Sequence, residues 1–374
     1  MFQHLTTKDG LASDITRFIF QDLKGFYWLG YDNGFQKFDG KNFTGFSFGN
    51  EYIKSNILEG PDIPPVEDNT GRIFVYNEGD VYVYNPSGRV DTIQIYDYAD
   101  DRFSDIFTFC KDELDNIWIV SERGIYKYDK DINKCVLWLS ITPRAMTGSL
   151  TTIIYDTHKK CLWLARDSNI FCVDIHSKKI SKPFFSVHAG KNDLPKTISF
   201  TGFWMDNNQN LWISSWNGSI YKYNTITYKK ERFDAFNYGK NKNQPDISIP
   251  LCFLEDRQKH IWIGCLNGGL YSYNNQTNLF HAVAASNNIP HFLHYDYYIS
   301  ALYEDKEGNI WVGTDKGINI FNPVVQQFNT LDENTFPKTE IEKIFQTSTG
   351  DILVGTWGKG WFMYDKDFQL KKQF

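Results

Sequence analysis

A repeat of 42–50 residues runs through this 374-residue chain and restricts it to folds built from equivalent units that pack side by side. Each copy has an apolar run ending in Asp, a short polar turn, Trp between aliphatic residues, a second turn with Gly, and an alternating run. The template is clearest in the segments FQDLKGFYWLGYDNGFQKFD, CKDELDNIWIVSERGIYKYD, LEDRQKHIWIGCLNGGLYSYN and YEDKEGNIWVGTDKGINIFN. Its length is that of one four-stranded blade of a β-propeller.

One large apolar residue stands at the centre of every copy. In the first seven copies these residues are Trp28, Phe74, Trp118, Trp163, Trp212, Trp262 and Trp311, and the eighth copy is centred on Leu353. An Asp precedes the centre in the first seven copies, whereas the eighth has Thr347. Because burying one such apolar side chain is worth about 1.5–3 kcal/mol, we interpret the central residues as packing between blades. We interpret the repeated Asp residues as turn formers, not as catalytic acid–base pairs.

The runs that flank these centres have the pattern of strands. ITRFIFQD, DIFTFCKD, LTTIIYDT, PLCFLED and ISALYED are rich in β-branched and aromatic residues, are bounded by turn formers, and lack a 3.6-residue stripe. Aromatic residues make up 17% of the chain and charged residues 22%, a balance that suits large packed sheets. We therefore predict an all-β fold, a β-propeller of four-stranded blades.

An open stack of blades would leave two sheet edges exposed, so we expect the ring to close. The N-terminal segment FQHLT resembles FNTL, which follows the seventh copy, and would supply the outer strand of the last blade. The predicted organisation is a seven-bladed propeller over residues 1–325, closed by the N-terminal strand. Residues 326–374 then form the eighth repeat, the first blade of a truncated second propeller. A single eight-bladed ring is the alternative.

Two stretches carry a resemblance to a known family. The opening HLTTKDGLASDITRFIFQDLKGFYWLGYDNGFQKFDG and repeated units such as DKEGNIWVGTDKG (Asp305 to Gly317) resemble the two-component regulator propeller repeat. That repeat belongs to the periplasmic sensor region of Bacteroides-type hybrid two-component histidine kinases. Its most specific element here is Asp9, Gly10 and Leu11 ahead of the first blade. The chain departs from the pattern where Phe74 replaces Trp and where Gly-Thr after the Trp is changed in several blades.

This resemblance implies a periplasmic sensor in which two seven-bladed propellers precede a β-sandwich, a membrane span, a histidine kinase and a DNA-binding regulator. It implies that the receptor responds to oligosaccharides from polysaccharide breakdown and signals to transcription. The implied partners are an oligosaccharide ligand, the downstream propeller and β-sandwich of the same polypeptide, and a second copy in a homodimer. This region would sense and would not catalyse.

Composition and motifs argue against several other classes. The net charge is −6 with scattered Lys and Arg, so we expect no contact with nucleic acid. The six cysteines lack CxxC spacing, and we interpret them as buried free thiols. GxSxG, HExxH and P-loop motifs are absent from the sequence, and His291 and His294 form a pair without a third ligand. We therefore expect no catalytic residue, metal or cofactor.

If the propeller itself binds a ligand, we expect the site on the face that carries the connections between second and third strands, because variable loops on a rigid scaffold usually hold specificity. Trp and Tyr beside Arg and Asn would suit stacking on a sugar ring and hydrogen bonding to its hydroxyl groups. Loop packing or a partner interface is the other interpretation of the same residues. The candidates are Tyr31, Asp32, Arg123, Arg166, Trp216, Asn217, Asn267, Asp315, Lys316 and Trp357.

Two other functions remain open at this point, because the propeller fold does not fix a function. One is a propeller enzyme of lyase or glycan-acting type, and the other is a secreted protein-binding scaffold. A cluster of His, Glu and Tyr converging on the propeller axis would favour the enzyme.

Overall fold

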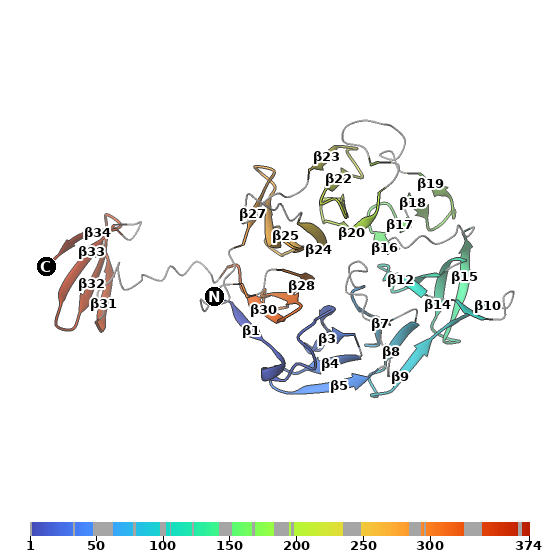
Figure 1. Cartoon of the computed structure of the whole chain (residues 1–374), viewed down its shortest axis with the longest axis horizontal. Coiled ribbons are helices and arrows are strands. Elements are labelled where there is room, and N and C mark those ends of the chain that lie inside the picture. Colours follow the sequence, from blue (N-terminus) through green and yellow to red (C-terminus); the bar gives the residue numbers. More distant parts are fainter. Residues whose placement is uncertain are drawn as a thin grey trace. The chain divides into compact units, whose positions relative to one another are not determined.

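The computed structural model describes residues 2–32, 34–47, 63–77, 80–97, 102–104, 106–121, 123–141, 152–166, 169–182, 194–195, 198–234, 248–283, 293–294, 297–324, 339–365 and 369–374. The chain divides into two compact units, Met1–Asn322 and Pro323–Phe374. Both are built from antiparallel strands, with one short 3-10 turn at Thr7–Asp9 in the described part of the first unit. The predicted all-β propeller is confirmed (Figure 1).

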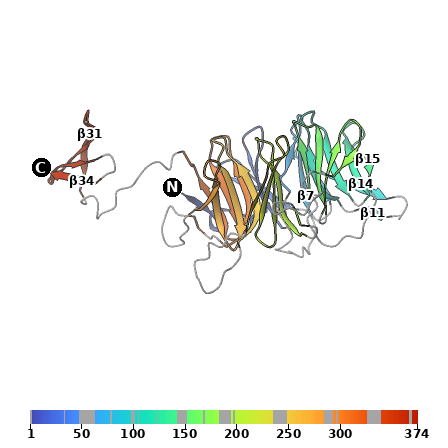
Figure 2. The same cartoon turned by 90° about the horizontal axis from the view of Figure 1, so that it is seen from above.

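The described residues of the first unit form seven four-stranded sheets around a common axis (Figures 1 and 2). Blade 1 contains β2 (Phe18–Gln21), β3 (Tyr27–Tyr31), β4 (Gly34–Phe38) and β5 (Phe43–Ser47). Blade 2 contains β6 (Val66–Glu67), β7 (Ile73–Asn77), β8 (Asp80–Tyr84) and β9 (Val90–Ile93). Blade 3 contains β12 (Ile106–Lys111), β13 (Ile117–Ser121), β14 (Gly124–Asp129) and β15 (Lys134–Ser140), and a small hairpin of β10 (Ile95–Asp97) and β11 (Arg102–Ser104) precedes it.

The remaining blades repeat this plan. Blade 4 contains β16 (Thr152–Asp156), β17 (Cys161–Arg166), β18 (Asn169–Asp174) and β19 (Ile180–Ser181). Blade 5 contains β20 (Phe200–Met205), β21 (Asn210–Ser215), β22 (Ile220–Asn224) and β23 (Lys230–Phe233). Blade 6 contains β24 (Ile249–Glu255), β25 (Ile261–Leu266), β26 (Gly269–Asn274) and β27 (Leu279–Ala282). Blade 7 contains β28 (Ile299–Glu304), β29 (Ile310–Thr314) and β30 (Gly317–Phe321), and its fourth strand comes from the other end of the unit.

That fourth strand is β1 (Gln3–Leu5), which pairs antiparallel with β30 in the register Gln3 to Ile320 and Leu5 to Ile318. Phe2 adds an apolar anchor, because its ring centroid lies 4.6 Å from that of Phe321. The N-terminal strand thus covers the edge that β30 would otherwise expose.

A buried hydrogen bond joins the repeated Asp and Trp in six of the seven blades. The indole N–H donates to the carboxylate at 2.8–3.0 Å in the pairs Trp28–Asp22, Trp118–Asp112, Trp163–Asp156, Trp212–Asp206, Trp262–Asp256 and Trp311–Asp305. The other carboxylate oxygen accepts backbone N–H groups of the following turn, as Asp305 does from Glu307 and Asn309. The Asp therefore orders the hairpin and holds the Trp in the layer between blades.

Blade 2 lacks this bond because Phe74 replaces the Trp, and another side chain takes the donor's place. Arg72 donates through Nε to Asp68 at 2.8 Å, and Thr70 donates its hydroxyl at 2.6 Å. Burial raises the pKa of the Asp68 carboxyl group, but these hydrogen bonds outweigh burial, so its pKa is lowered. The turn is thus preserved with different chemistry.

In blades 1, 5, 6 and 7 the turn after the Asp also ties its blade to the next blade. The backbone N–H that follows the Asp donates to the side chain that precedes the Asp of the neighbouring blade. These bonds join Leu23 to Glu67, Asn207 to Glu255, Arg257 to Glu304 and Lys306 to Gln21, at 2.6–3.0 Å. The last of them joins blade 7 to blade 1, so the junction that closes the ring repeats the geometry found within it.

The second unit is one sheet of β31 (Ile341–Gln346), β32 (Ile352–Thr356), β33 (Gly360–Tyr364) and β34 (Leu370–Gln373). Its small core contains Val354, Phe362 and Tyr364. Thr347 takes over the turn role of the Asp, because its hydroxyl accepts the backbone N–H of Asp351 at 3.0 Å. That this sheet begins a second propeller stays a prediction.

The Asp–Trp bond can be tested at Trp28, the one donor to Asp22 Oδ2 among the described residues. We expect Trp28→Phe to lower the free energy of unfolding by about 2–4 kcal/mol, because a buried carboxylate oxygen loses its donor and the smaller ring leaves a void. The measurement is denaturant unfolding. Trp216→Phe, at a partly exposed indole, is the matched control and should change stability by less than about 0.5 kcal/mol.

The closing strand can be tested at Gly317, which has a φ of +112°. A Cβ at this position would lie 2.3 Å from the Leu5 carbonyl oxygen on β1. We expect Gly317→Ala to destabilise the ring by more than about 1 kcal/mol, because the substitution strains the backbone and displaces the closing strand. Gly45→Ala, where a Cβ meets nothing within 4 Å, is the control. Equal thermal midpoints for the two variants would contradict this role for β1.

Candidate functional site

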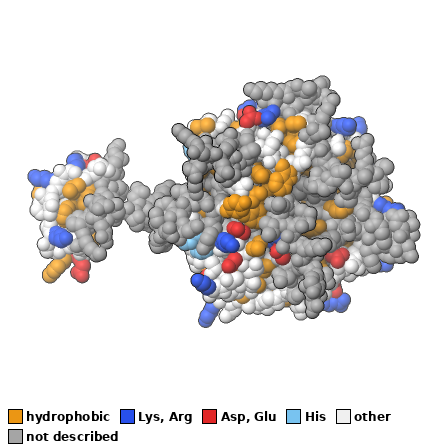
Figure 3. All heavy atoms as spheres, in the orientation of Figure 1, with side chains coloured by type: hydrophobic (Ala, Val, Ile, Leu, Met, Phe, Trp, Pro, Cys, Tyr) orange, Lys and Arg blue, Asp and Glu red, His pale blue; other side chains and the backbone are white. Residues whose placement is uncertain are grey.

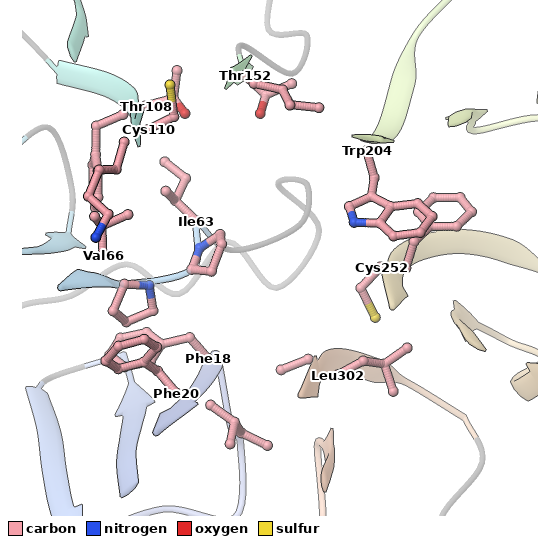
Figure 4. A pocket seen from close by; sticks show the side chains of 18 of the residues that line it. Phe18, Phe20, Ile63, Val66, Thr108, Cys110, Thr152, Trp204, Cys252 and Leu302 are labelled. Carbon is pink, nitrogen blue, oxygen red and sulfur yellow. The ribbon is translucent and has the colours of Figure 1, made fainter. Parts of the chain in front are cut away.

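A channel runs along the axis of the ring, with a cavity of about 650 Å³. Every blade contributes its first strand to the wall, through residues that include Phe20, Val66, Cys110, Ile154, Trp204, Cys252 and Leu302. Figure 4 shows the labelled side chains surrounding an open space. On the face of the ring seen in Figure 3, hydrophobic side chains gather near the centre. The volume is typical of small-molecule sites, but the wall is apolar for most of its length.

Polar groups line the channel mainly at its two mouths. We call the face where the first strands begin the top face, and the face where they end the bottom face. Gln21, Glu67 and Lys111 lie at the bottom mouth, and all three take part in bonds between blades. Burial raises the pKa of the Glu67 carboxyl group. The bottom polar groups are thus occupied in holding the ring together.

The top mouth carries a different set of polar and aromatic side chains. Arg17 lies at the start of β2, and its Nε is 2.5 Å from Asp32 Oδ1. Its Nη1 lies 3.5 Å from the Tyr298 hydroxyl oxygen, which reaches blade 1 from blade 7. The backbone N–H of Asn267 in blade 6 donates to the Tyr297 carbonyl at 2.6 Å. These contacts join blades 6, 7 and 1 at one rim of the channel.

Two buried side-chain oxygens on the top face have no hydrogen-bond partner within the described part of the chain. They are Oδ1 of Asn267, between β25 and β26, and Oδ1 of Asp315, between β29 and β30. The ring of Tyr297 is 62% exposed beside Asn267. We call Arg17, Asp32, Asn267, Tyr297, Tyr298 and Asp315 the top-face cluster. It offers planar polar groups next to an aromatic surface, a combination that can bind hydroxyl groups and an apolar ring face.

The candidates predicted from the sequence have different positions in the structure. Tyr31 is only 4% exposed and packs in the core between blades 7 and 1, so it is not an exposed loop residue. Its hydroxyl donates to Gln36 at 2.9 Å, and burial raises its pKa. Gln36 in turn binds the backbone of Gly10 and Ala12. Tyr31 therefore helps to hold the N-terminal segment that contains Asp9, Gly10 and Leu11.

Six further candidates are spread over other places. Trp216 is 37% exposed on the top face of blade 5, and Asn217 beside it is used within the turn, where its Oδ1 accepts from Ser215 and Ser219. Arg123 lies in the turn of blade 3, where its carbonyl accepts the Ile141 N–H. Lys316 accepts a bond from His4 through its carbonyl. Trp357 belongs to the second unit, and the side chain of Arg166 lies outside the described residues.

The top-face cluster contains three residues that the sequence did not single out: Arg17, Tyr297 and Tyr298. All three directly precede the first strand of a blade, and this segment reaches the same face as the connection between second and third strands. A usable signal was the charged or aromatic residue directly before the first strands of blades 1 and 7.

The predicted histidine pair lies partly outside the described residues, since His291 is not among them. His294 instead faces His4 of the closing strand, with ring centroids 4.8 Å apart. Within the described residues no group of three His, Cys, Asp or Glu is placed to hold a metal ion. In the same residues no helix is long and apolar enough to cross a membrane.

The His4 environment predicts a pH dependence of stability. Burial and the neighbouring His294 lower the pKa of His4. The Lys316 carbonyl, Asp9 and Asp14 raise it, but burial has the largest effect, and the pKa lies below 6.5. The unfolded chain therefore takes up a proton near pH 6.5 that the folded chain accepts only at lower pH, and stability falls as the pH drops below 6.5. We expect His4→Gln to reduce the fall in the unfolding midpoint between about pH 7.5 and pH 5.5. His281→Gln, on the exposed strand β27, should leave the fall unchanged.

Comparison with known proteins supports the family resemblance. Residues 296–316 match the sequence model of the two component regulator propeller, which confirms the resemblance for the blade that carries the clearest repeat. A search of curated proteins finds no match.

Solved structures with the same fold include two sensor domains and an enzyme. The extracellular domain of the putative hybrid two component system BT3049 from B. thetaiotaomicron matches with a TM-score of 0.66 and 19% identity, over 100% of this chain and 49% of that chain. That of BT4673 from the same organism matches with 0.64 and 18%, over 99% and 46%. Virginiamycin B lyase from Staphylococcus aureus matches with 0.62 and 13%, over 86% and 98%. The chain thus spans about half the length of the sensor domains, and at these identities the likeness is one of fold.

Proposed function

We propose that this chain is the extracytoplasmic ligand-sensing propeller of a hybrid two-component sensor histidine kinase, and that its ligand is an oligosaccharide. In this proposal the chain works in the periplasm and signals to transcription through other parts of the same polypeptide. Those parts are a second propeller, a β-sandwich and the kinase, and the receptor acts as a homodimer. The match of residues 296–316 and the fold shared with extracellular sensor domains support the sensor role.

The top-face cluster is the observation that carries the choice of ligand. A sugar ring has an apolar face that stacks on an aromatic side chain, and hydroxyl groups that bond to planar amide, carboxylate and guanidinium groups. Tyr297 offers the exposed ring, and Asn267 and Asp315 have side-chain oxygens that still lack a donor among the described residues. Leaving such a buried oxygen without a donor costs about 1–3 kcal/mol. In this proposal the two side chains turn outward on binding, because both oxygens are buried in the free chain, and a hydroxyl group of the ligand supplies the missing donor.

The channel interior is a poorer place for the same ligand. Much of its wall is made of side chains such as Phe20, Ile154 and Leu302, which cannot replace the hydrogen bonds that sugar hydroxyl groups lose on leaving water. The rim above it has both kinds of group, so the proposal assigns the ligand to the rim. Loop packing or a protein interface remains the competing use of this surface.

The axis carries part of the set of side chains that would favour a lyase. Among the described residues that line the channel, Glu67 and Tyr155 are present, but the third member of the expected catalytic set, a histidine, is not. The fold shared with virginiamycin B lyase does not transfer an activity, because one fold serves many functions.

Calorimetry of the 374-residue chain with a panel of defined oligosaccharides tests the proposal. We expect one class to bind and to be recovered chemically unchanged. Tyr297→Ala and Asn267→Ala should each weaken binding by about tenfold or more, which corresponds to 1.4 kcal/mol. Tyr228→Ala is the matched control, because Tyr228 is similarly exposed but lies in the turn between the third and fourth strands of blade 5.

Three results would count against this proposal. Absence of binding by the folded chain would contradict an oligosaccharide ligand. Equal losses of affinity for Tyr297→Ala and Tyr228→Ala would contradict the top-face cluster as the binding site. Cleavage of the bound sugar would favour the enzyme.

A further inference from the structure

Two of the six cysteines lie in contact with each other. All six are free thiols in the structure, and Sγ of Cys161 lies 2.9 Å from Sγ of Cys172. This is the one contact between two cysteine sulfur atoms among the described hydrogen bonds. Spacing alone does not predict this contact, because the two residues are eleven positions apart and outside any CxxC pattern.

The contact follows from the register of blade 4. Strands β17 and β18 are antiparallel, and the register pairs Cys161 with Asp174 and Trp163 with Cys172. Cys161 and Cys172 are therefore diagonal neighbours on the same face of the sheet, and their side chains converge so that the two sulfur atoms are in contact. A disulfide requires a sulfur–sulfur distance of about 2.05 Å, so the two atoms need to approach by roughly 0.9 Å.

The two thiols differ in accessibility and in acidity. Cys161 is only 2% exposed and packs in the core between blades 4 and 5, whereas Cys172 is partly exposed at the edge of that core. The hydrogen bond between the thiols lowers the pKa of Cys172 and raises that of Cys161. The Lys159 ammonium group lowers the pKa of Cys172 further. Because the thiolate is the nucleophile in exchange, Cys172 is suited to react first.

We propose that Cys161 and Cys172 form an intramolecular disulfide that links β17 to β18 when the chain meets a disulfide oxidant. The Cys172 thiolate attacks one sulfur of the oxidant, for example oxidised glutathione, and releases one glutathione thiolate. The Cys161 thiol loses its proton and attacks the Cys172 sulfur of the mixed disulfide, which releases the second glutathione. Two protein thiols are oxidised, and one glutathione disulfide is reduced to two thiols.

The other cysteines lack this arrangement. Cys252 has its sulfur directed to the Ile299 carbonyl at 3.7 Å and lines the channel, and Cys265 is fully buried. Cys110 lies on β12 and Cys135 on β15, which are the first and the last strand of blade 3, so two strands lie between them. The proposal therefore concerns the pair in blade 4, whose sulfur atoms are in contact. It is independent of the proposed ligand and sensor role.

The folded 374-residue chain is incubated with oxidised glutathione, its remaining thiols are blocked, and it is then denatured and digested. We expect the thiol count to fall from six to four, and mass spectrometry to find one crosslinked peptide pair that joins Cys161 to Cys172. Cys172→Ser and Cys161→Ala should each abolish the crosslink, and Cys135→Ser should retain it. The oxidised wild-type chain should also unfold at a higher midpoint than the chain treated with dithiothreitol.

The crosslinks found in the oxidised wild-type chain test the proposed disulfide even if a variant fails to fold. Six remaining thiols after oxidation of the folded chain would overturn the proposal. A crosslink between other cysteines, or stable glutathione adducts on Cys172 without the internal link, would overturn it as well.

Discussion

A buried hydrogen bond from a Trp indole to an Asp carboxylate sets the geometry of nearly every blade. A carboxylate in an apolar layer is costly unless donors surround it, so its presence selects the one turn that provides them. In blade 7, Asp305 fixes the turn through the backbone of Glu307 and Asn309 and fixes the layer through Trp311. The next residue, Lys306, then bonds across to Gln21. A single side chain therefore determines the hairpin, the packing layer and the link to the following blade.

The repeated part of this design could be predicted from the sequence, and the unrepeated part could not. Spacing and residue type were enough for the all-β propeller and for the buried Trp layer. Tyr31 was assigned to a loop because nothing in the sequence shows that β3 continues through it, and one residue of register decides whether a side chain faces the core. The substitution of Phe74 is balanced by Arg72, a pairing that appears only when the turn is folded. Arg17 and Tyr298 meet across 281 positions of the chain, which no local pattern reports.

The two mouths of the channel also differ in whether their polar residues belong to the repeat. The bottom mouth uses Glu67, Gln21 and Lys111 in bonds that repeat around the ring, whereas the top mouth gathers side chains that occur once. The top-face cluster contains residues from blades 6, 7 and 1. Blades 7 and 1 are also joined by a backbone hydrogen bond of 2.7 Å, which the N–H of Gly317 donates to the carbonyl of Asp14. A ligand held there would touch both sides of the junction that β1 closes. Binding and ring closure would then be coupled, because each stabilises contacts that the other needs.

The pairing of β1 with β30 also determines when the ring can close during synthesis and export. Strand β1 is made long before its partner, which ends at Phe321. At about 5–20 residues per second, roughly 15–60 s of translation separate the two. During that interval the N-terminal segment has no partner strand, and blades 1 to 6 stand as an open stack. A nascent chain of this protein thus depends, for tens of seconds, on whatever shields an unpaired strand and an uncovered blade face from neighbouring polypeptides.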